Sequence, residues 1–187
     1  MPHLLSFLGL TGRRRLEAMR PRLYRLAYAW CHDATLADDL AQETMAKALG
    51  RGEQLRDSAA LEGWLFAILN NCWRDHLRTR KEFLDVEDLD EVILAHDDSP
   101  ERLYARRQAT LRVRDAIGAL PLSQRQVITL VDIEECSYAQ VAQVLDVPVG
   151  TVMSRLSRAR QAIKKDLSRE YMQAEPAEDR PLLRRVK

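Results

Sequence analysis

The segment PVGTVMSRLSRARQAI, residues 148–163, carries basic and hydroxyl side chains on an apolar repeat of helical period. At 100° per residue, one stripe of this helix is apolar and the opposite face is polar. The stripe holds Val152, Leu156, Ala159 and Ile163, and the polar face holds Ser154, Ser157, Arg158, Gln161 and Lys165. Arginine and lysine neutralise phosphates or read guanine edges, and serine and glutamine hydrogen-bond to either, so this face suits a DNA duplex. A solvated basic face on an ordinary amphipathic helix has the same pattern.

A short capped helix is predicted directly before this segment. Ser137 and Gln140 have the spacing of a capping box, which starts a helix just after Ser137. The packing residues of this helix are Val141, Val144 and Leu145. Pro148 has a backbone angle suited to the first turn of the next helix. Helix, turn and basic helix in this order favour a helix-turn-helix.

A second polar face is predicted near the N-terminus, over residues 36–49. The residues expected to face a core are Ala37, Leu40, Ala41, Ala48 and Leu49, and those expected to be displayed are Asp38, Asp39, Gln42, Glu43 and Ala46. An acidic stripe that also carries an amide suits docking on a basic partner helix. A plain solvated acidic face looks the same in sequence.

These faces require helices, and the chain predicts little else. Glycine and proline number seven each in 187 residues, strand-like alternation is absent, and a 3.6-residue apolar period recurs. Helices are predicted over residues 16–30, 36–49 and 61–81, followed by a helical block over 103–167, so the fold class is all-α. The inward residues expected of the first and third helices are Leu16, Leu23, Leu26, Ala27, Trp30, Trp64, Leu65, Ile68, Leu69, Cys72 and Leu77.

Charge is nearly balanced, with 29 basic and 28 acidic residues, but it is segregated along the chain. Residues 82–101 contain acidic side chains and no lysine or arginine, and like charges keep a linker extended. We therefore predict two small helical domains, residues 1–82 and 103–170, that meet only through a flexible acidic linker, residues 83–102. The tail, residues 171–187, is expected to be poorly ordered.

The cysteines and the N-terminus indicate a cytoplasmic chain. Cys31, Cys72 and Cys136 are far apart and lie in apolar helical patterns, which suits free thiols in a reducing compartment. The apolar N-terminal run precedes its arginines, unlike a secretory signal, and is too short to span a bilayer. No membrane contact is expected.

Catalytic and metal-binding patterns are weak. Cys72 and His76 are four residues apart and Cys31 and His32 are adjacent, but structural zinc sites usually show tighter paired spacing. Neither a glycine-rich phosphate loop nor a Ser-His-Asp arrangement is present. We predict no metal, no cofactor and no enzymatic activity.

Residues 120–163 resemble the promoter-binding fourth domain of the extracytoplasmic-function sigma factors, in the sigma-70 family. Upstream, ATLADDLAQETMAKAL (residues 34–49) and GWLFAILNNCWRDHLRTRK (residues 63–81) resemble the second domain of this family. The resemblance implies a bacterial RNA polymerase sigma factor that recognises minus-35 and minus-10 promoter elements. It also implies a stress or envelope response and control by an anti-sigma factor.

The resemblance implies partners for each surface. Asp39, Gln42 and Glu43 would contact the clamp coiled coil of the largest subunit of core RNA polymerase, and the flap would be a further contact. Promoter DNA would be bound in double- and single-stranded form. The acidic linker would thread the RNA-exit path of the polymerase.

Two sets of DNA-binding residues follow from the resemblance. For the minus-10 strand they are Leu55, Arg56, Asp57 and Ser58 of the specificity loop, Asn71 of the base pocket, and Arg74 and Arg78 on phosphates. For the minus-35 duplex they are Thr151, Met153, Ser154, Arg155, Ser157, Arg158 and Gln161. Trp73 is interpreted as a packed aromatic rather than a base-stacking one.

One alternative is a sigma mimic that titrates an anti-sigma factor without binding promoters. The basic residues around Asn71 and on the last helix favour the sigma factor, since a mimic does not need them. A stand-alone repressor would explain the helix-turn-helix but would leave Asp39, Gln42, Glu43 and the acidic linker without a role.

Overall fold

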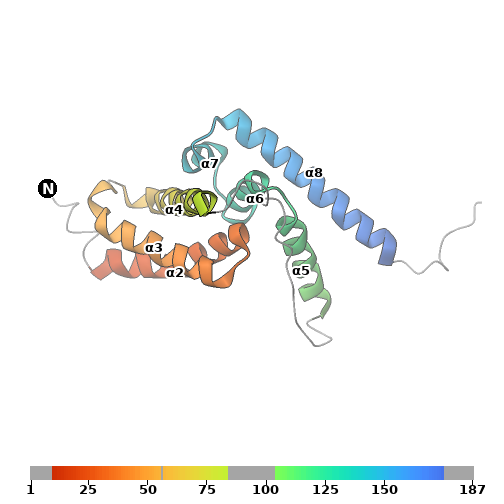
Figure 1. Ribbon diagram of the computed structural model, residues 1–187, viewed down its shortest axis with the longest axis horizontal. Helices are drawn as coiled ribbons and strands as arrows, with labels where there is room; N and C mark the ends of the chain where they lie inside the picture. Colours follow the sequence, from red (N-terminus) through yellow and green to blue (C-terminus); the bar gives the residue numbers. More distant parts are fainter. Residues whose placement is uncertain (1–9, 56, 84–103, 175–187) are drawn as a thin grey trace, which may run out of the picture.

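The computed structural model describes residues 10–55, 57–83 and 104–174, the coloured parts of Figure 1. Every regular element in these residues is helical, so the predicted all-α class is confirmed. The α-helices are α2 (Leu10–Cys31), α3 (Ala34–Gly50), α4 (Leu61–Phe83), α5 (Tyr104–Gly118), α6 (Leu122–Ile128), α7 (Tyr138–Leu145) and α8 (Val149–Ala174). Short 3-10 turns, η1 (Gly52–Gln54) and η2 (Ser58–Ala60), connect α3 to α4, and a π-helical turn, η3 (Thr129–Ile133), continues α6.

Helices α2, α3 and α4 form an N-terminal unit, in which α2 and α3 lie side by side (Figure 1). Most residues predicted to face inward are buried, but Leu49 is 43% exposed. Leu49 lies in the last turn of α3, about 100° around the helix from buried Ala48, and its side chain is on the solvent-exposed side. Thr44 lies in the core of this unit, and its hydroxyl donates to the carbonyl of Leu40 at 2.7 Å. This bond gives the buried hydroxyl group the hydrogen-bond partner that it needs away from water.

Helices α5 to α8 form a C-terminal unit that contains the predicted helix-turn-helix, α7 and α8. The capping box is present. Ser137 Oγ accepts from the backbone N–H of Gln140 at 3.3 Å, and Gln140 Oε1 accepts from the backbone N–H of Ser137 at 2.8 Å. Asp146 ends α7 in the left-handed region, with φ 55°, and α8 begins directly after Pro148. Six of the predicted inward residues of this motif are buried: Val141, Val144, Leu145, Val152, Leu156 and Ala159. The seventh, Ile163, is half-buried and packs against the core.

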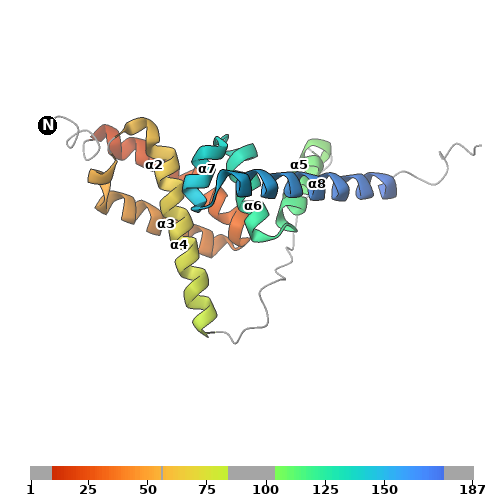
Figure 2. The same ribbon diagram turned by 90° about the horizontal axis from the view of Figure 1, so that it is seen from above.

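The two units pack directly on each other, which corrects the expectation that they meet only through the linker. The indole N–H of Trp30, at the end of α2, donates to Thr129 Oγ1 of η3 at 2.9 Å, and both residues are buried. Arg125 of α6 donates to the carbonyl of Trp30 at 3.0 Å. Where α4 lies beside α7 (Figure 2), the Asn70 amide donates to the carbonyl of Val144 at 3.0 Å. Buried polar groups with satisfied partners define one relative position of the two units.

Gln126 completes this contact, because its amide donates to Asn70 Oδ1 at 3.1 Å. We call the contact the interdomain seam and define it by its buried or half-buried polar residues. These residues are Trp30, Asn70, Arg125, Gln126 and Thr129.

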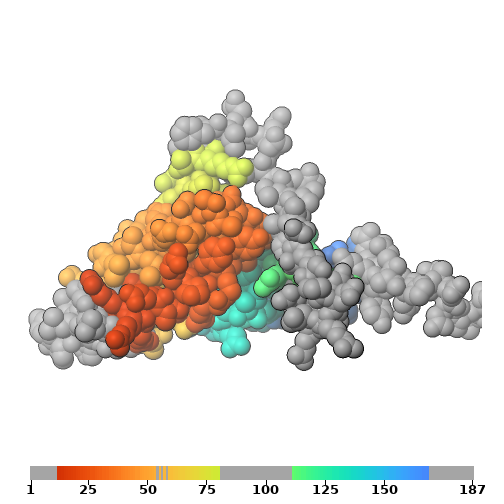
Figure 3. All heavy atoms as spheres, turned by 90° about the horizontal axis from the view of Figure 1, so that it is seen from below, coloured from red at the N-terminus to blue at the C-terminus, as the bar shows by residue number. Residues whose placement is uncertain are grey.

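An arginine bridges the two units beside the seam. Arg22 of α2 lies 2.6 Å from a carboxylate oxygen of Glu62 on α4 and 2.8 Å from one of Glu134, which follows η3. Burial alone would lower the pKa of the Arg22 guanidinium. The hydrogen bonds with Glu62 and Glu134 outweigh this effect, so the net result is a raised pKa. The Glu134 side chain is 5% exposed, so without Arg22 a buried charge would remain unpaired. In Figure 3 the surface of α2 and α3 adjoins that of the C-terminal unit.

The predicted domain boundaries differ from the helix ends by a few residues. Helix α4 continues to Phe83, within the predicted linker, and α8 continues to Ala174, so residues 171–174 of the predicted tail are helical. The rest of the linker and tail (residues 84–102 and 175–187), residues 1–9 and Arg56 lie outside the described residues. No described helix combines the length and the apolar character needed to cross a membrane.

His32 lies next to the seam, between α2 and α3, with φ 55°. Burial lowers the pKa of His32 from 6.5 to about 4, and the charge of Arg125 lowers it as well. A hydrogen bond with the Gly118 backbone opposes this shift only in part. His32 is therefore neutral in the folded chain at neutral pH, and its protonation requires a charge at a partly buried position.

We predict that acidification weakens the fold through His32. The unfolded chain takes up this proton near pH 6.5, whereas the folded chain resists protonation down to about pH 4. The free energy of unfolding should therefore fall as pH falls from about 6.5 to about 4. The free energy of unfolding of His32→Asn should fall less steeply with pH, because asparagine tolerates the left-handed backbone but does not titrate. Urea denaturation of both proteins across this range measures the effect, and identical pH slopes would contradict it.

Candidate nucleic-acid interfaces

The outer face of α8 displays the residues predicted to contact a duplex. Thr151 and Arg155 are half-buried at its border, and the exposed residues are Met153, Ser154, Ser157, Arg158 and Gln161. Between residues 149 and 165, α8 contains no carboxylate, so no like charge on this part of the helix opposes phosphates. Met153 is 53% exposed and adds an apolar group to an otherwise polar surface.

Two nearby arginines of α8 face different surroundings. Arg160 donates two hydrogen bonds, of 2.6 and 3.1 Å, to the carboxylate of Asp132 in η3. These bonds raise the pKa of Arg160 and hold it toward the body of the protein. Arg158 lies about 200° around the helix from Arg160 and is exposed. Arg158 is thus the arginine of this pair that faces a ligand approaching the outer face of α8.

A polar pocket of about 610 Å³ lies between the end of α3 and α4. It is lined by four cations, one amide, one carboxylate and one apolar side chain. These residues are Lys47, Arg51, Arg74, Arg78, Asn71, Asp75 and Ile68. The structure therefore brings together Asn71, Arg74 and Arg78, which the sequence analysis assigned to the minus-10 strand.

Three pocket residues were missed by the sequence analysis. Asp75 follows Asn71 by four residues on α4, so helical spacing alone places both on one face. That signal was available in the sequence. Lys47 and Arg51 lie at the end of α3, and their position in the pocket depends on how α3 packs against α4.

Three charged side chains of the pocket, Lys47, Asp75 and Arg78, form ion pairs. Lys47 Nζ lies 2.8 Å from Glu43 and 3.8 Å from Asp75, and Asp75 lies 3.2 Å from Arg78. The hydrogen bond with Glu43 raises the pKa of Lys47, which keeps the amine charged at neutral pH. Exposed ion pairs of this kind add little stability, so they can rearrange around an anionic ligand.

The loop before α4 does not contribute described residues to this pocket. Leu55 is half-buried and packs against the core. Asp57 Oδ1 accepts from the Ala59 N–H at 2.8 Å, which caps η2. Arg56 lies outside the described residues, and the side chain of Ser58 is not described. The predicted specificity loop and Asn71 are thus not brought together within the described part of the chain.

Trp64, Phe66 and Trp73 of α4 pack inside the protein. Trp73 is 6% exposed and stacks on His76, with 5.8 Å between the ring centroids, as expected for a packed aromatic. Trp64 and Leu77 are half-buried and pack against the core.

The acidic face of α3 is displayed as predicted. Asp39, Gln42 and Glu43 are all exposed. The Gln42 amide donates to Asp38 Oδ2 at 2.6 Å, and Asp38 also pairs with Arg20 of α2 at 2.6 Å. These contacts fix the position of the Gln42 amide, so α3 presents an ordered acidic surface.

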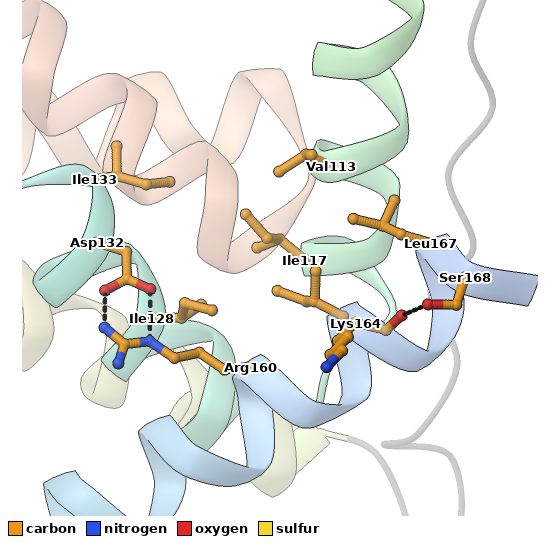
Figure 4. A pocket seen from close by; sticks show the side chains of 10 residues that line it. Val113, Ile117, Ile128, Asp132, Ile133, Arg160, Lys164, Leu167 and Ser168 are labelled. Atoms are coloured by element: carbon orange, nitrogen blue, oxygen red, sulfur yellow. Dashed lines mark hydrogen bonds and ion pairs between the residues drawn. The ribbon is translucent and has the colours of Figure 1, made fainter. Parts of the chain in front are cut away.

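An apolar groove of about 830 Å³ lies between α5, η3 and α8 (Figure 4). Val113 of α5 and Ile133 of η3 are 41% and 55% exposed, and Leu167 of α8 also lines the groove. The ion pair of Arg160 with Asp132 lies at one side of the groove. Exposed apolar side chains gathered in a groove are typical of docking surfaces for apolar partners.

The candidate metal-ligand pairs do not form a site in the described residues. Cys72 is buried beside Thr44, whereas His76 stacks on Trp73. No group of three or more histidine, cysteine, aspartate or glutamate side chains there is placed to bind a metal ion. Burial raises the pKa of each cysteine thiol.

Comparison with known families identifies two matching regions of the chain. The family described as Sigma-70 region 2 matches residues 16–83, and Sigma-70, region 4 matches residues 110–163. The RNA polymerase sigma-H factor of Pseudomonas aeruginosa is 35% identical over 155 residues, which cover 78% of this chain and 80% of that protein. The ECF RNA polymerase sigma factor SigE of Mycolicibacterium smegmatis is 36% identical over 152 residues, 79% of this chain. The chain spans 58% of the length of that relative.

Solved structures have the same architecture. Sigma factor RpoE, in complex with the anti-sigma factor NepR from Bartonella quintana, aligns with a TM-score of 0.68 at 26% identity, over 83% of this chain and 96% of that chain. CnrH, in complex with the cytosolic domain of CnrY, aligns with a TM-score of 0.56 at 25% identity, over 84% of this chain and 90% of that chain. The chain therefore belongs to the sigma-70 family, as a sigma factor of the extracytoplasmic-function group.

Proposed function

We propose that this sigma factor directs core RNA polymerase to specific promoters, binding the minus-35 element as duplex and the minus-10 element as a single strand. The observation that carries the proposal is the presence of two separate DNA-compatible surfaces on one chain. One is the carboxylate-free outer face of α8, and the other is the cation-rich pocket between α3 and α4. Duplex and single-stranded DNA require different contacts, and these two surfaces differ accordingly.

The duplex surface is the outer face of α8. Exposed Arg158 can hydrogen-bond to guanine edges or to phosphates. The hydroxyls of Ser154 and Ser157 can hydrogen-bond to base edges or to phosphates. Exposed Met153 provides an apolar contact for a thymine methyl group. Thr151, Arg155 and Gln161 complete the surface at its border, where phosphate contacts set the register of the helix on DNA.

The single-strand surface is the pocket with Asn71. Melted DNA exposes bases that a pocket can enclose, while cations follow the backbone. Asn71 offers both a donor and an acceptor to a base edge, and Arg74 and Arg78 lie beside it for phosphates. Leu55, Arg56, Asp57 and Ser58 belong to this proposal as the loop that approaches the strand.

Core polymerase is the proposed partner of two further surfaces. Asp39, Gln42 and Glu43 on α3 would dock on the basic clamp coiled coil of the largest subunit. The groove of Figure 4 would receive an apolar segment of the flap, because its walls carry exposed Val113 and Ile133. These surfaces lie on different units of the chain.

An anti-sigma factor is the proposed regulator. The relatives RpoE and CnrH are seen with the anti-sigma factor NepR and with CnrY, respectively. Since the interdomain seam fills the space between the two units here, we place the anti-sigma factor on the exposed polymerase-binding surfaces rather than inside the seam. Control of a stress or envelope response in the cytoplasm belongs to the same proposal and rests on membership of the group.

The chief alternative is a sigma mimic that binds an anti-sigma factor without reading promoters. Such a protein needs the partner surfaces but not a cation-rich pocket around Asn71 or the basic outer face of α8. Both are present here. Run-off transcription from genomic fragments separates the two functions: the sigma factor yields discrete transcripts with core polymerase, and the mimic yields none.

We predict that Asp39→Lys weakens binding to core polymerase several-fold, because it reverses a charge that faces a basic partner. Co-purification with core enzyme measures the loss, and circular dichroism checks that helicity is kept. Asp115→Lys, the same change at an exposed site on α5, serves as the control and should bind normally. Equal binding by all three proteins would contradict the assignment of this face.

We predict that Arg158→Ala and Asn71→Ala separate the two DNA-binding activities. Arg158→Ala should weaken binding to duplex minus-35 DNA by about 1–3 kcal/mol, and the loss should persist on templates already melted at the minus-10 element. Asn71→Ala should leave duplex binding nearly unchanged but impair open-complex formation. Electrophoretic binding to both DNA types and permanganate footprinting of melted thymines measure these effects. Equal losses for both variants on both DNAs would refute the two-surface assignment.

A further inference from the structure

The polar pocket contains a carboxylate that phosphate binding does not explain. Asp75 lies among Lys47, Arg51, Arg74 and Arg78, so a negative charge occupies a surface otherwise built for an anion. A carboxylate repels phosphate, and in that setting it lowers the affinity for a nucleic-acid backbone. A carboxylate at this position is instead suited to contact a part of the ligand other than its phosphates.

The position of Asp75 leaves its oxygens accessible. Oδ2 lies 3.8 Å from Lys47 Nζ and Oδ1 lies 3.2 Å from Arg78, while the side chain is 51% exposed. An ionised carboxylate has about four acceptor sites, so these two cations do not exhaust it.

A nucleobase is the ligand part that such an acceptor can distinguish. Cytosine and adenine carry an exocyclic amine, which donates to a carboxylate, whereas thymine carries a carbonyl oxygen at the matching position, which a carboxylate repels. Asn71 lies one helical turn before Asp75 in the same pocket and can hydrogen-bond to a neighbouring base atom. The pocket volume of about 610 Å³ is within the usual range for small-ligand sites.

We infer that Asp75 is a specificity-determining residue of this pocket and selects a flipped base with an exocyclic amine, which is cytosine, adenine or guanine, over thymine. This inference rests on the proposed function, because it assigns the pocket to an unpaired promoter base. Lys47 and Arg78 orient the carboxylate, and the remaining cations bind the backbone on either side of the base.

The test uses holoenzyme reconstituted from core polymerase and the full chain, with a pool of single-stranded oligonucleotides randomised over the minus-10 region. Bound oligonucleotides are sequenced for the wild type, Asp75→Asn, Asn71→Ala and the control Asp115→Asn. The pocket position is the one whose base preference is lost in Asn71→Ala. At that position the wild type and Asp115→Asn should prefer bases with an exocyclic amine over thymine by about tenfold or more, which is the effect expected of one charge-assisted hydrogen bond.

Asp75→Asn should lose this preference while overall binding stays within a few-fold of the wild type, because an amide donates and accepts without discriminating between the bases. In a defined oligonucleotide, replacing the selected cytosine by uracil, or the selected adenine by hypoxanthine, should weaken wild-type binding about tenfold and leave Asp75→Asn unaffected.

Two results would overturn the inference while leaving the proposed function intact. One is wild-type selection of thymine at the pocket position. The other is an Asp75→Asn variant that binds all bases more weakly but keeps the wild-type preference, since Asp75 would then only position Lys47 and Arg78. A wild-type holoenzyme that selects no sequence at any position would overturn the proposed function together with the inference.

Discussion

The structure depends on the interdomain seam, a set of buried hydrogen bonds between two helical units that are far apart in sequence. Trp30 and Thr129 are 99 residues apart, and Asn70 and Val144 are 74 apart, yet each pair is joined by a bond of about 3 Å. A buried indole or amide without a partner costs more than the bond itself contributes, so these groups strongly favour a single arrangement of the two units. The bridging pair of Arg22 and Glu134 acts in the same way.

Helix α4 links the seam to the candidate DNA surface. Asn70 is 2% exposed and hydrogen-bonds across the seam, whereas the next residue, Asn71, is exposed and lines the polar pocket. Adjacent helical residues are separated by 100°, so burial of one side of α4 presents the other side to a ligand. The seam also leaves the outer face of α8 uncovered. Both proposed DNA contacts are therefore available on the packed protein.

How much of this could be predicted from the sequence depends on the type of side chain. Apolar periodicity correctly indicated the helices and most of the core, because burial of a stripe such as Val152 and Leu156 follows from helical geometry. The resemblance assigned Asn71, Arg74 and Arg78 to one surface, and the structure groups them. The seam was not predictable, since Asn70 and Thr129 look like solvated residues until two distant units meet. Lys47 and Arg51 were missed because their place in the pocket depends on tertiary packing.

We expect the seam to make one rigid body of the two units in the free chain. Backbone ¹⁵N relaxation by NMR reports the rotational correlation time of each helix. Amides of α2–α4 and of α6–α8 should show the same correlation time, with the value expected for the whole 21.5-kDa chain. Two different and shorter correlation times, one for each unit, would contradict this expectation.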